Sequence, residues 1–191
     1  MSLVLNNKIP PLAVGFARSR DLLGGLIAAC RGGVPAIFNN NFPTHAFLYT
    51  QDSGCMFATE EGSAGLVEDC LCKYTDENNR IVSVLYWRGW DDAAKSARAE
   101  THLAQIRSAG GSRAAYGYSI LPYFLPLIGN WFKPKPETLV DGSEICSEDV
   151  AGIHICDGGV TWLSSKLLAP DQLYAAMVAS KECAILPPYL S

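Results

Sequence analysis

The sequence predicts a single α+β domain, and three observations support this fold class. The chain has 191 residues, a length that one hydrophobic core usually serves. Apolar residues make up 49% of the chain and charged residues 18%, which excludes a disordered protein and supplies enough apolar side chains for a core. The expected elements follow the order strand, helix, a run of strands, then helices. No internal repeat or linker interrupts this order, so residues 1–191 are expected to form one domain.

The first elements expected are a strand and a helix. The apolar run over residues 12–16 predicts a short buried strand. Ser19 is then placed to cap a helix over about residues 20–30, because a serine hydroxyl can accept a hydrogen bond from the free amides of a first helical turn. Gly32 and Gly33 are expected to end this helix.

Three further strands are expected in the middle of the chain. Residues 45–49 and 55–59 are apolar runs on either side of residues 51–54, whose sequence Gln-Asp-Ser-Gly is typical of a hairpin turn. Residues 80–87 are dense in β-branched and aromatic side chains and predict the clearest strand of the chain.

The remaining elements are expected to be helical. Asp91 or Asp92 is placed to cap a helix that reaches about residue 109, where two glycines follow. A second helix is expected over about residues 143–152, and a third over about residues 170–180, where Pro-Asp at the start is typical of a first helical turn.

Charge excludes one class of function. The formal net charge is −4, and no block of lysine or arginine occurs anywhere in the chain. Proteins that bind nucleic acid usually carry a basic patch that follows the phosphates. We therefore expect no nucleic-acid partner.

Hydropathy indicates that the chain does not span a membrane. The most apolar stretch, residues 119–132, is 14 residues long and contains Pro122 and Pro126, whereas a spanning helix needs about 20 consecutive apolar residues. The N-terminus lacks a basic lead, an apolar run and a cleavage site, so no signal peptide is expected. The predicted location is the cytoplasm, or outside the cell by a route that needs no signal peptide. The same apolar stretch is a candidate surface for a protein or lipid partner, and the alternative is burial against the core.

The seven cysteines predict reduced thiols rather than a disulfide framework, because their number is odd and their spacing irregular. Zinc knuckles use a cysteine pair with two residues between its members. Cys70 and Cys72 have one residue between them, and no second cysteine pair accompanies them. We therefore expect neither a metal nor another cofactor.

Cys146 is the candidate nucleophile. Ser143 is placed to cap a helix, which puts Cys146 in the first helical turn, where free backbone amides and the helix dipole favour a thiolate. The same amides can bind the oxyanion formed after attack on a carbonyl. Nearby Glu144, Glu148 and Asp149 oppose thiolate formation, so a partner base is needed. The alternative is an ordinary buried cysteine.

His45 is the candidate base among the three histidines. His102 lies on a predicted surface helix, and His154 is explained as a cation near a helix end, whereas His45 begins a strand at the end of the sheet. Its alternative is a strand-end surface residue. Either Glu60 or Glu61, on the strand that follows the hairpin, can orient the imidazole, and we prefer Glu60. The alternative for both is a pair of solvated turn acids.

The order of these motifs resembles that of the circularly permuted papain-fold cysteine hydrolases. These are relatives of NlpC-type cell-wall peptidases and of lecithin:retinol acyltransferase, and they include the YiiX-like bacterial group, in which the histidine comes first and the nucleophilic cysteine last. The matching segments are His45–Tyr49, Glu60 with Gly65–Leu66, Tyr116–Tyr118, Cys146–Val150 and Pro170–Leu173. The chain departs from the pattern at Asp149, where the family has leucine, in the Glu pair, and in the inserted residues 119–132.

The resemblance implies a papain-like antiparallel sheet packed against helices and a thiol hydrolase or acyltransferase that works through a thioester. It assigns Cys146 as nucleophile, His45 as base and Glu60 as the orienting acid, with Tyr116 and Tyr118 as substrate-binding candidates. The implied substrate is a small peptide, as in bacterial peptidoglycan, or an acyl chain on a lipid. The alternative function is a catalytically retired papain-like scaffold that serves as a structural part of an assembly, for instance a phage particle.

Overall fold

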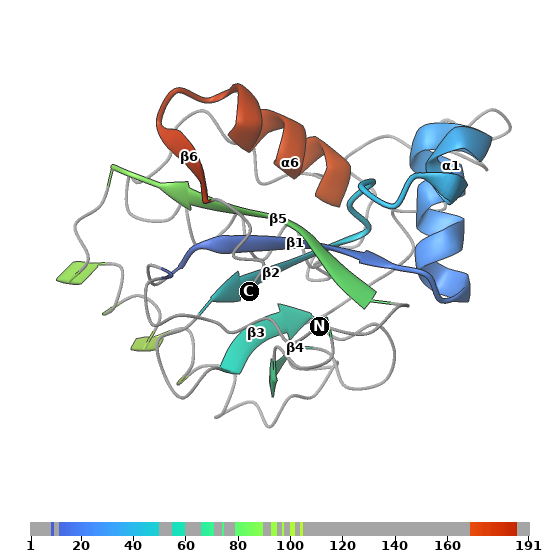
Figure 1. The fold of residues 1–191 in the computed structure, drawn as a ribbon. Helices are drawn as coiled ribbons and strands as arrows, with labels where there is room; N and C mark the ends of the chain where they lie inside the picture. Colours follow the sequence, from blue (N-terminus) through green and yellow to red (C-terminus); the bar gives the residue numbers. More distant parts are fainter. Residues whose placement is uncertain are drawn as a thin grey trace, which may run out of the picture.

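The computed structural model describes part of the chain in detail: residue 9, residues 12–49, 55–59, 66–70, 74, 79–89 and 169–186, and helical positions 93, 94, 97, 100, 101 and 104. These residues form an α+β fold in which two helices pack against an antiparallel sheet (Figure 1). The predicted α+β class is therefore confirmed.

The sheet in the described part of the chain has six strands in the order β4-β3-β2-β1-β5-β6, and every neighbouring pair is antiparallel. The strands are β1 (Val14–Ser19), β2 (His45–Tyr49), β3 (Cys55–Thr59), β4 (Leu66–Cys70), β5 (Asn79–Trp87) and β6 (Cys183–Leu186). The helices α1 (Leu22–Phe38) and α6 (Pro170–Ala179) lie against the part of the sheet that β2, β1, β5 and β6 form (Figure 1).

The strand predictions are confirmed where they rest on a hairpin or on β-branched residues. Strands β2 and β3 have the predicted bounds, and β5 begins one residue before the predicted residues 80–87. The strand expected at residues 12–16 begins later, at Val14, and runs to Ser19 because it pairs along its whole length with β5. Strands β4 and β6 were not predicted.

Helix α1 corrects two predictions. The residue that caps it is Asp21, whose carboxylate accepts a hydrogen bond from the Gly24 amide at 2.7 Å. Ser19 instead ends β1. The helix also does not stop at the two glycines: Gly33, with φ 69°, breaks it, and a second helical segment runs on to Phe38. Pro35 fits this second segment because it lies in its first turn, where no backbone donor is needed.

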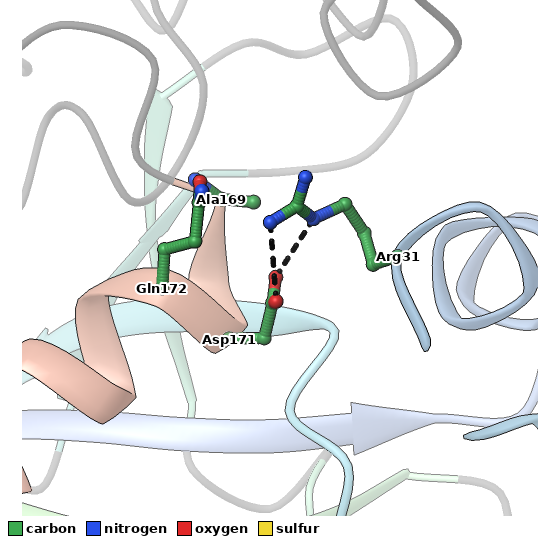
Figure 2. A network of polar contacts seen from close by, with 4 residues as sticks. All are labelled: Arg31, Ala169, Asp171 and Gln172. Atoms are coloured by element: carbon green, nitrogen blue, oxygen red, sulfur yellow. Dashed lines mark hydrogen bonds and ion pairs between the residues drawn. The ribbon is translucent and has the colours of Figure 1, made fainter. Parts of the chain in front are cut away.

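Helix α6 confirms the predicted start at Pro170 and ends at Ala179. Its first turn is fixed by two contacts, which Figure 2 shows. The Ala169 amide donates to the Gln172 side chain at 3.0 Å, and the Arg31 guanidinium of α1 makes a two-bond ion pair with Asp171, at 3.1 and 3.2 Å. The two helices are therefore joined directly.

The other predicted helices lie wholly or largely outside the described residues. Positions 93, 94, 97, 100, 101 and 104 are helical, as the prediction for the region up to residue 109 requires, but the ends of that helix are not described. The helix expected over residues 143–152 lies outside the described part of the chain. No helix among the described residues is long and apolar enough to cross a membrane.

The face of β1 that meets the helices carries large side chains. The Phe16 ring packs edge-on against Tyr174 of α6, with the centroids 5.2 Å apart. Arg18 is only 2% exposed, and its guanidinium donates to the carbonyl of Gly24 at 3.0 Å and to that of Ile37 at 2.9 Å. These acceptors belong to the two segments of α1, so this side chain holds both segments to the sheet. Burial lowers the pKa of Arg18, but a guanidinium remains charged at any ordinary pH.

The opposite face of β1 carries small residues. Ala13, Ala17, Phe47, Tyr49 and Tyr74 form a buried cluster there. Gly15 pairs with Phe47 across β1 and β2, and a Cβ atom added to this glycine would lie 2.1 Å from the phenyl ring. The small residues of β1 therefore make room for the large rings of β2.

Candidate functional site

His45 is the predicted site residue that the structure describes, and it is buried. It is the first residue of β2, as predicted, and it pairs with Ala17 of β1. Only 4% of the residue is exposed, which contradicts the alternative of a strand-end surface residue. The imidazole therefore belongs to the protein interior on the face that carries the aromatic cluster, since alternate residues of a strand share a face.

Thr44 fixes the backbone just before His45. Its amide donates to the Ala17 carbonyl at 2.9 Å, and its Oγ1 accepts a hydrogen bond from the Ser19 amide at 3.0 Å. The residue is fully buried. The threonine hydroxyl thus supplies the acceptor for a backbone donor at the point where the β1–β2 ladder ends, and the start of β2 is held from two directions.

Aromatic rings surround the His45 imidazole. The Tyr74 ring stacks on it, with centroids 6.1 Å apart and planes 16° apart, and the Phe47 ring lies 6.4 Å away at 31°. Tyr74 and Phe47 stack on each other at 4.9 Å. Sequence reasoning missed Tyr74, because it lies outside the predicted strands, between β4 and β5, and only the folded chain brings it to this cluster.

Tyr49 completes the aromatic row on β2. Its ring centroid lies 5.3 Å from that of Phe47, and the residue is 3% exposed. Its hydroxyl makes no hydrogen bond to the described residues. Burial raises the pKa of Tyr49, so the phenol stays protonated at neutral pH.

The other predicted site residues lie outside the described part of the chain. These are Cys146, Glu60 with its alternative Glu61, Tyr116 and Tyr118. His102, His154, the hairpin turn at residues 51–54 and the apolar residues 119–132 lie there as well. The predicted association of His45 with a nucleophile and an acid thus stays a prediction.

Cys30 and Cys183 are free thiols with raised pKa values. Burial raises the pKa of Cys30. Burial also raises the pKa of Cys183, to about 11, which the nearby Glu182 carboxylate reinforces and a hydrogen bond with Ser180 partly offsets. Both thiols are therefore weak nucleophiles at neutral pH. Within the described ranges, no group of three or more His, Cys, Asp or Glu side chains is arranged to hold a metal ion.

Comparison with protein-family models, with curated proteins and with solved structures finds no match for this chain.

Proposed function

We propose that this protein is a thiol hydrolase of the circularly permuted papain-like type, in which Cys146 is the nucleophile and His45 the base. The observation that carries the proposal is the environment of His45. His45 is buried at the first position of a central strand, its backbone is held by Thr44 and its ring lies beside Tyr74, and this fixed position is what a general base requires.

The order of the described elements supports the same proposal. The histidine strand β2 lies beside β1 in an antiparallel sheet, and β3 follows it as its next neighbour. Helix α6 begins at Pro170, in the segment that matches the late Pro-Asp motif of the permuted hydrolases. Both features agree with the motif order on which the resemblance rests.

The register between β2 and β3 favours Glu60 over Glu61 as the acid. Phe47 pairs with Ala58, and Leu48 pairs with Phe57. If this register continues past the end of β3, position 60 falls opposite His45, and position 61 falls on the other face. Directly opposed side chains of antiparallel strands are neighbours, so we propose that Glu60 accepts the hydrogen bond that orients the imidazole.

The proposed reaction proceeds through a thioester. His45 accepts the Cys146 thiol proton, and the thiolate attacks the carbonyl carbon of an amide or ester. The backbone amide of Cys146 stabilises the oxyanion, the bond to the leaving group breaks, and His45 gives that group its proton. A water molecule then attacks the thioester while His45 takes its proton, and the acid product leaves as the proton returns to the Cys146 sulfur. No cofactor takes part in this scheme.

The proposed substrates follow from the resemblance. They are a small peptide with an amide bond, as in bacterial cell walls, or an acyl chain in ester linkage to a lipid. Tyr116 and Tyr118 are proposed to contact the substrate, and residues 119–132 to supply an apolar contact for it or for a partner protein. A bacterial or phage protein is the expected source of such an activity.

Thiol alkylation tests the proposed function without a known substrate. Native protein is treated with iodoacetamide from about pH 4 to about pH 9, and the labelled cysteines are mapped by mass spectrometry for the wild type and for His45→Ala. We expect Cys146 to react fastest below about pH 7 in the wild type and to lose this reactivity in the variant. Cys30 and Cys183 are the internal controls, because their raised pKa values make them slow in both proteins.

Equal rates for Cys146, Cys30 and Cys183 at every pH would contradict the catalytic proposal. The remaining hypothesis would then be the structural scaffold without catalytic activity. A fast Cys146 that is unaffected by His45→Ala would contradict the assignment of the base.

A further inference from the structure

The imidazole of His45 needs more than its backbone to be held in one orientation. Thr44 and Ala17 fix the start of β2, but the side chain still has two torsions, and the second torsion of histidine has broad, shallow preferences. Neighbouring rings can restrict this torsion, in addition to the hydrogen bond proposed for Glu60. A general base that is misplaced by about 1 Å can lose about a hundredfold in rate, so this restriction matters for catalysis.

Tyr74 is the ring that best matches the plane of the imidazole. Its plane is 16° from that of His45, whereas the plane of Phe47 is 31° away. Tyr74 is itself 4% exposed, and its ring stacks on that of Phe47 with the centroids 4.9 Å apart, so this packing fixes the position of Tyr74. The centroids of the His45 and Tyr74 rings are 6.1 Å apart, so the two nearly parallel rings are displaced sideways, and Tyr74 lies along one side of the imidazole.

We propose that Tyr74 is a positioning residue that sets the ring plane of His45 for proton transfer. This inference rests on the proposed function, because it assumes that His45 is the base. It assigns a role to a residue far from the histidine in sequence, in the segment between β4 and β5. The stacked ring contacts the imidazole and takes no part in bond making or breaking.

The structural half of the proposal is tested on the wild-type protein by proton NMR. Stacked aromatic rings shift the resonances of nearby protons, so the ring protons of His45 are expected upfield of their positions in an unfolded chain. His45→Ala identifies these resonances. Unshifted His45 ring protons in the folded wild type would overturn the proposal before any Tyr74 variant is made.

The effect of the Tyr74 ring on the reactivity of Cys146 is tested with a pair of variants. Tyr74→Phe keeps the ring, and we expect the upfield shift and the Cys146 alkylation rate to remain within about twofold of the wild type. Tyr74→Leu keeps an apolar side chain but removes the ring, and we expect a loss of the upfield contribution and a fall of about tenfold or more in the alkylation rate at about pH 6. Tyr74→Met serves as the ring-free variant if the leucine variant does not fold.

Tyr174→Leu is the matched control, because it makes the same exchange at an aromatic contact on the opposite face of β1. It is expected to leave the His45 resonances and the alkylation rate unchanged. If His45→Ala abolishes Cys146 reactivity while folded Tyr74→Leu or Tyr74→Met retains it, the inference about Tyr74 is wrong and the proposed function stands. If His45→Ala has no effect, the proposed function fails and the role of Tyr74 in catalysis fails with it, whatever the NMR shifts show.

Discussion

The two faces of β1 differ in the size of their side chains. The face toward the helices carries large side chains such as Phe16 and Arg18, which contact α6 and α1 directly. The other face carries Gly15 and Ala17, with Ala13 just before the strand, and the rings of β2 pack beside these small residues. One strand therefore serves two purposes. Its large residues attach the helices, and its small residues leave the room in which His45 and its aromatic neighbours are held.

Arg18→Met is expected to have the largest effect on stability, because it breaks the attachment of α1. The substitution keeps an apolar stem but removes the donors for carbonyls in both segments of the kinked helix. We expect a loss of about 4 kcal/mol in the free energy of unfolding, measured by urea denaturation. Arg20→Met is the matched control, since Arg20 is exposed, and it is expected to cost less than about 0.5 kcal/mol. Equal losses for the two variants would contradict the proposed role of Arg18.

Gly15→Ala tests the opposite face. The added Cβ atom would meet the Phe47 ring at 2.1 Å, so the ring or the strand must move, and we expect a loss of about 3 kcal/mol. Gly25→Ala is the control, because a Cβ atom there meets nothing within 4 Å, and in a helix this exchange is expected to stabilise by about 0.5 to 1 kcal/mol. A stabilising Gly15→Ala would show that the small residues of β1 are not needed.

Thr44→Val removes the hydroxyl that accepts from the Ser19 amide while keeping the shape of the side chain. The buried amide is left without its acceptor, so we expect a loss of about 2 kcal/mol in the free energy of unfolding. Thr44→Ser restores the acceptor and is expected to recover more than half of this loss. If serine and valine destabilise the protein equally, packing rather than the hydrogen bond holds the start of β2.

Tyr49→Phe is expected to have the smallest effect. The Tyr49 hydroxyl is buried and makes no hydrogen bond to the described residues, so its removal breaks no hydrogen bond among them. We expect a change within about 0.5 kcal/mol, or a small gain in stability, because burying a polar group without a partner is unfavourable. Thermal unfolding measures this directly. A loss above about 1 kcal/mol would show that the hydroxyl has a partner elsewhere in the chain.

The sequence predicted the elements whose causes are local. The bounds of β2 and β3 follow from a turn sequence between two apolar runs, and the start of α6 follows from Pro170, whose fixed backbone angle suits a first helical turn. The strand position of His45 did not predict its burial, because the residues beside it, Ala17 and Tyr74, are distant in sequence.

The features that were missed depend on contacts between distant residues. Strand β6 has four residues and exists because it pairs with β5, which no local pattern indicates. The continuation of α1 beyond Gly33 depends in part on Arg18, which binds a carbonyl in each segment. Asp21 rather than Ser19 caps the helix because β1 extends through Ser19 to pair with Asn79.

The proposed activation of Cys146 by His45 is tested most directly by a crystal structure of the full chain, which gives the distance between the Cys146 sulfur and the ring nitrogens of His45. The proposed reaction requires a Cys146 Sγ within about 4 Å of an imidazole nitrogen, because a proton must pass between them. A distance above about 8 Å, with both side chains well ordered, would contradict the claim that His45 activates Cys146.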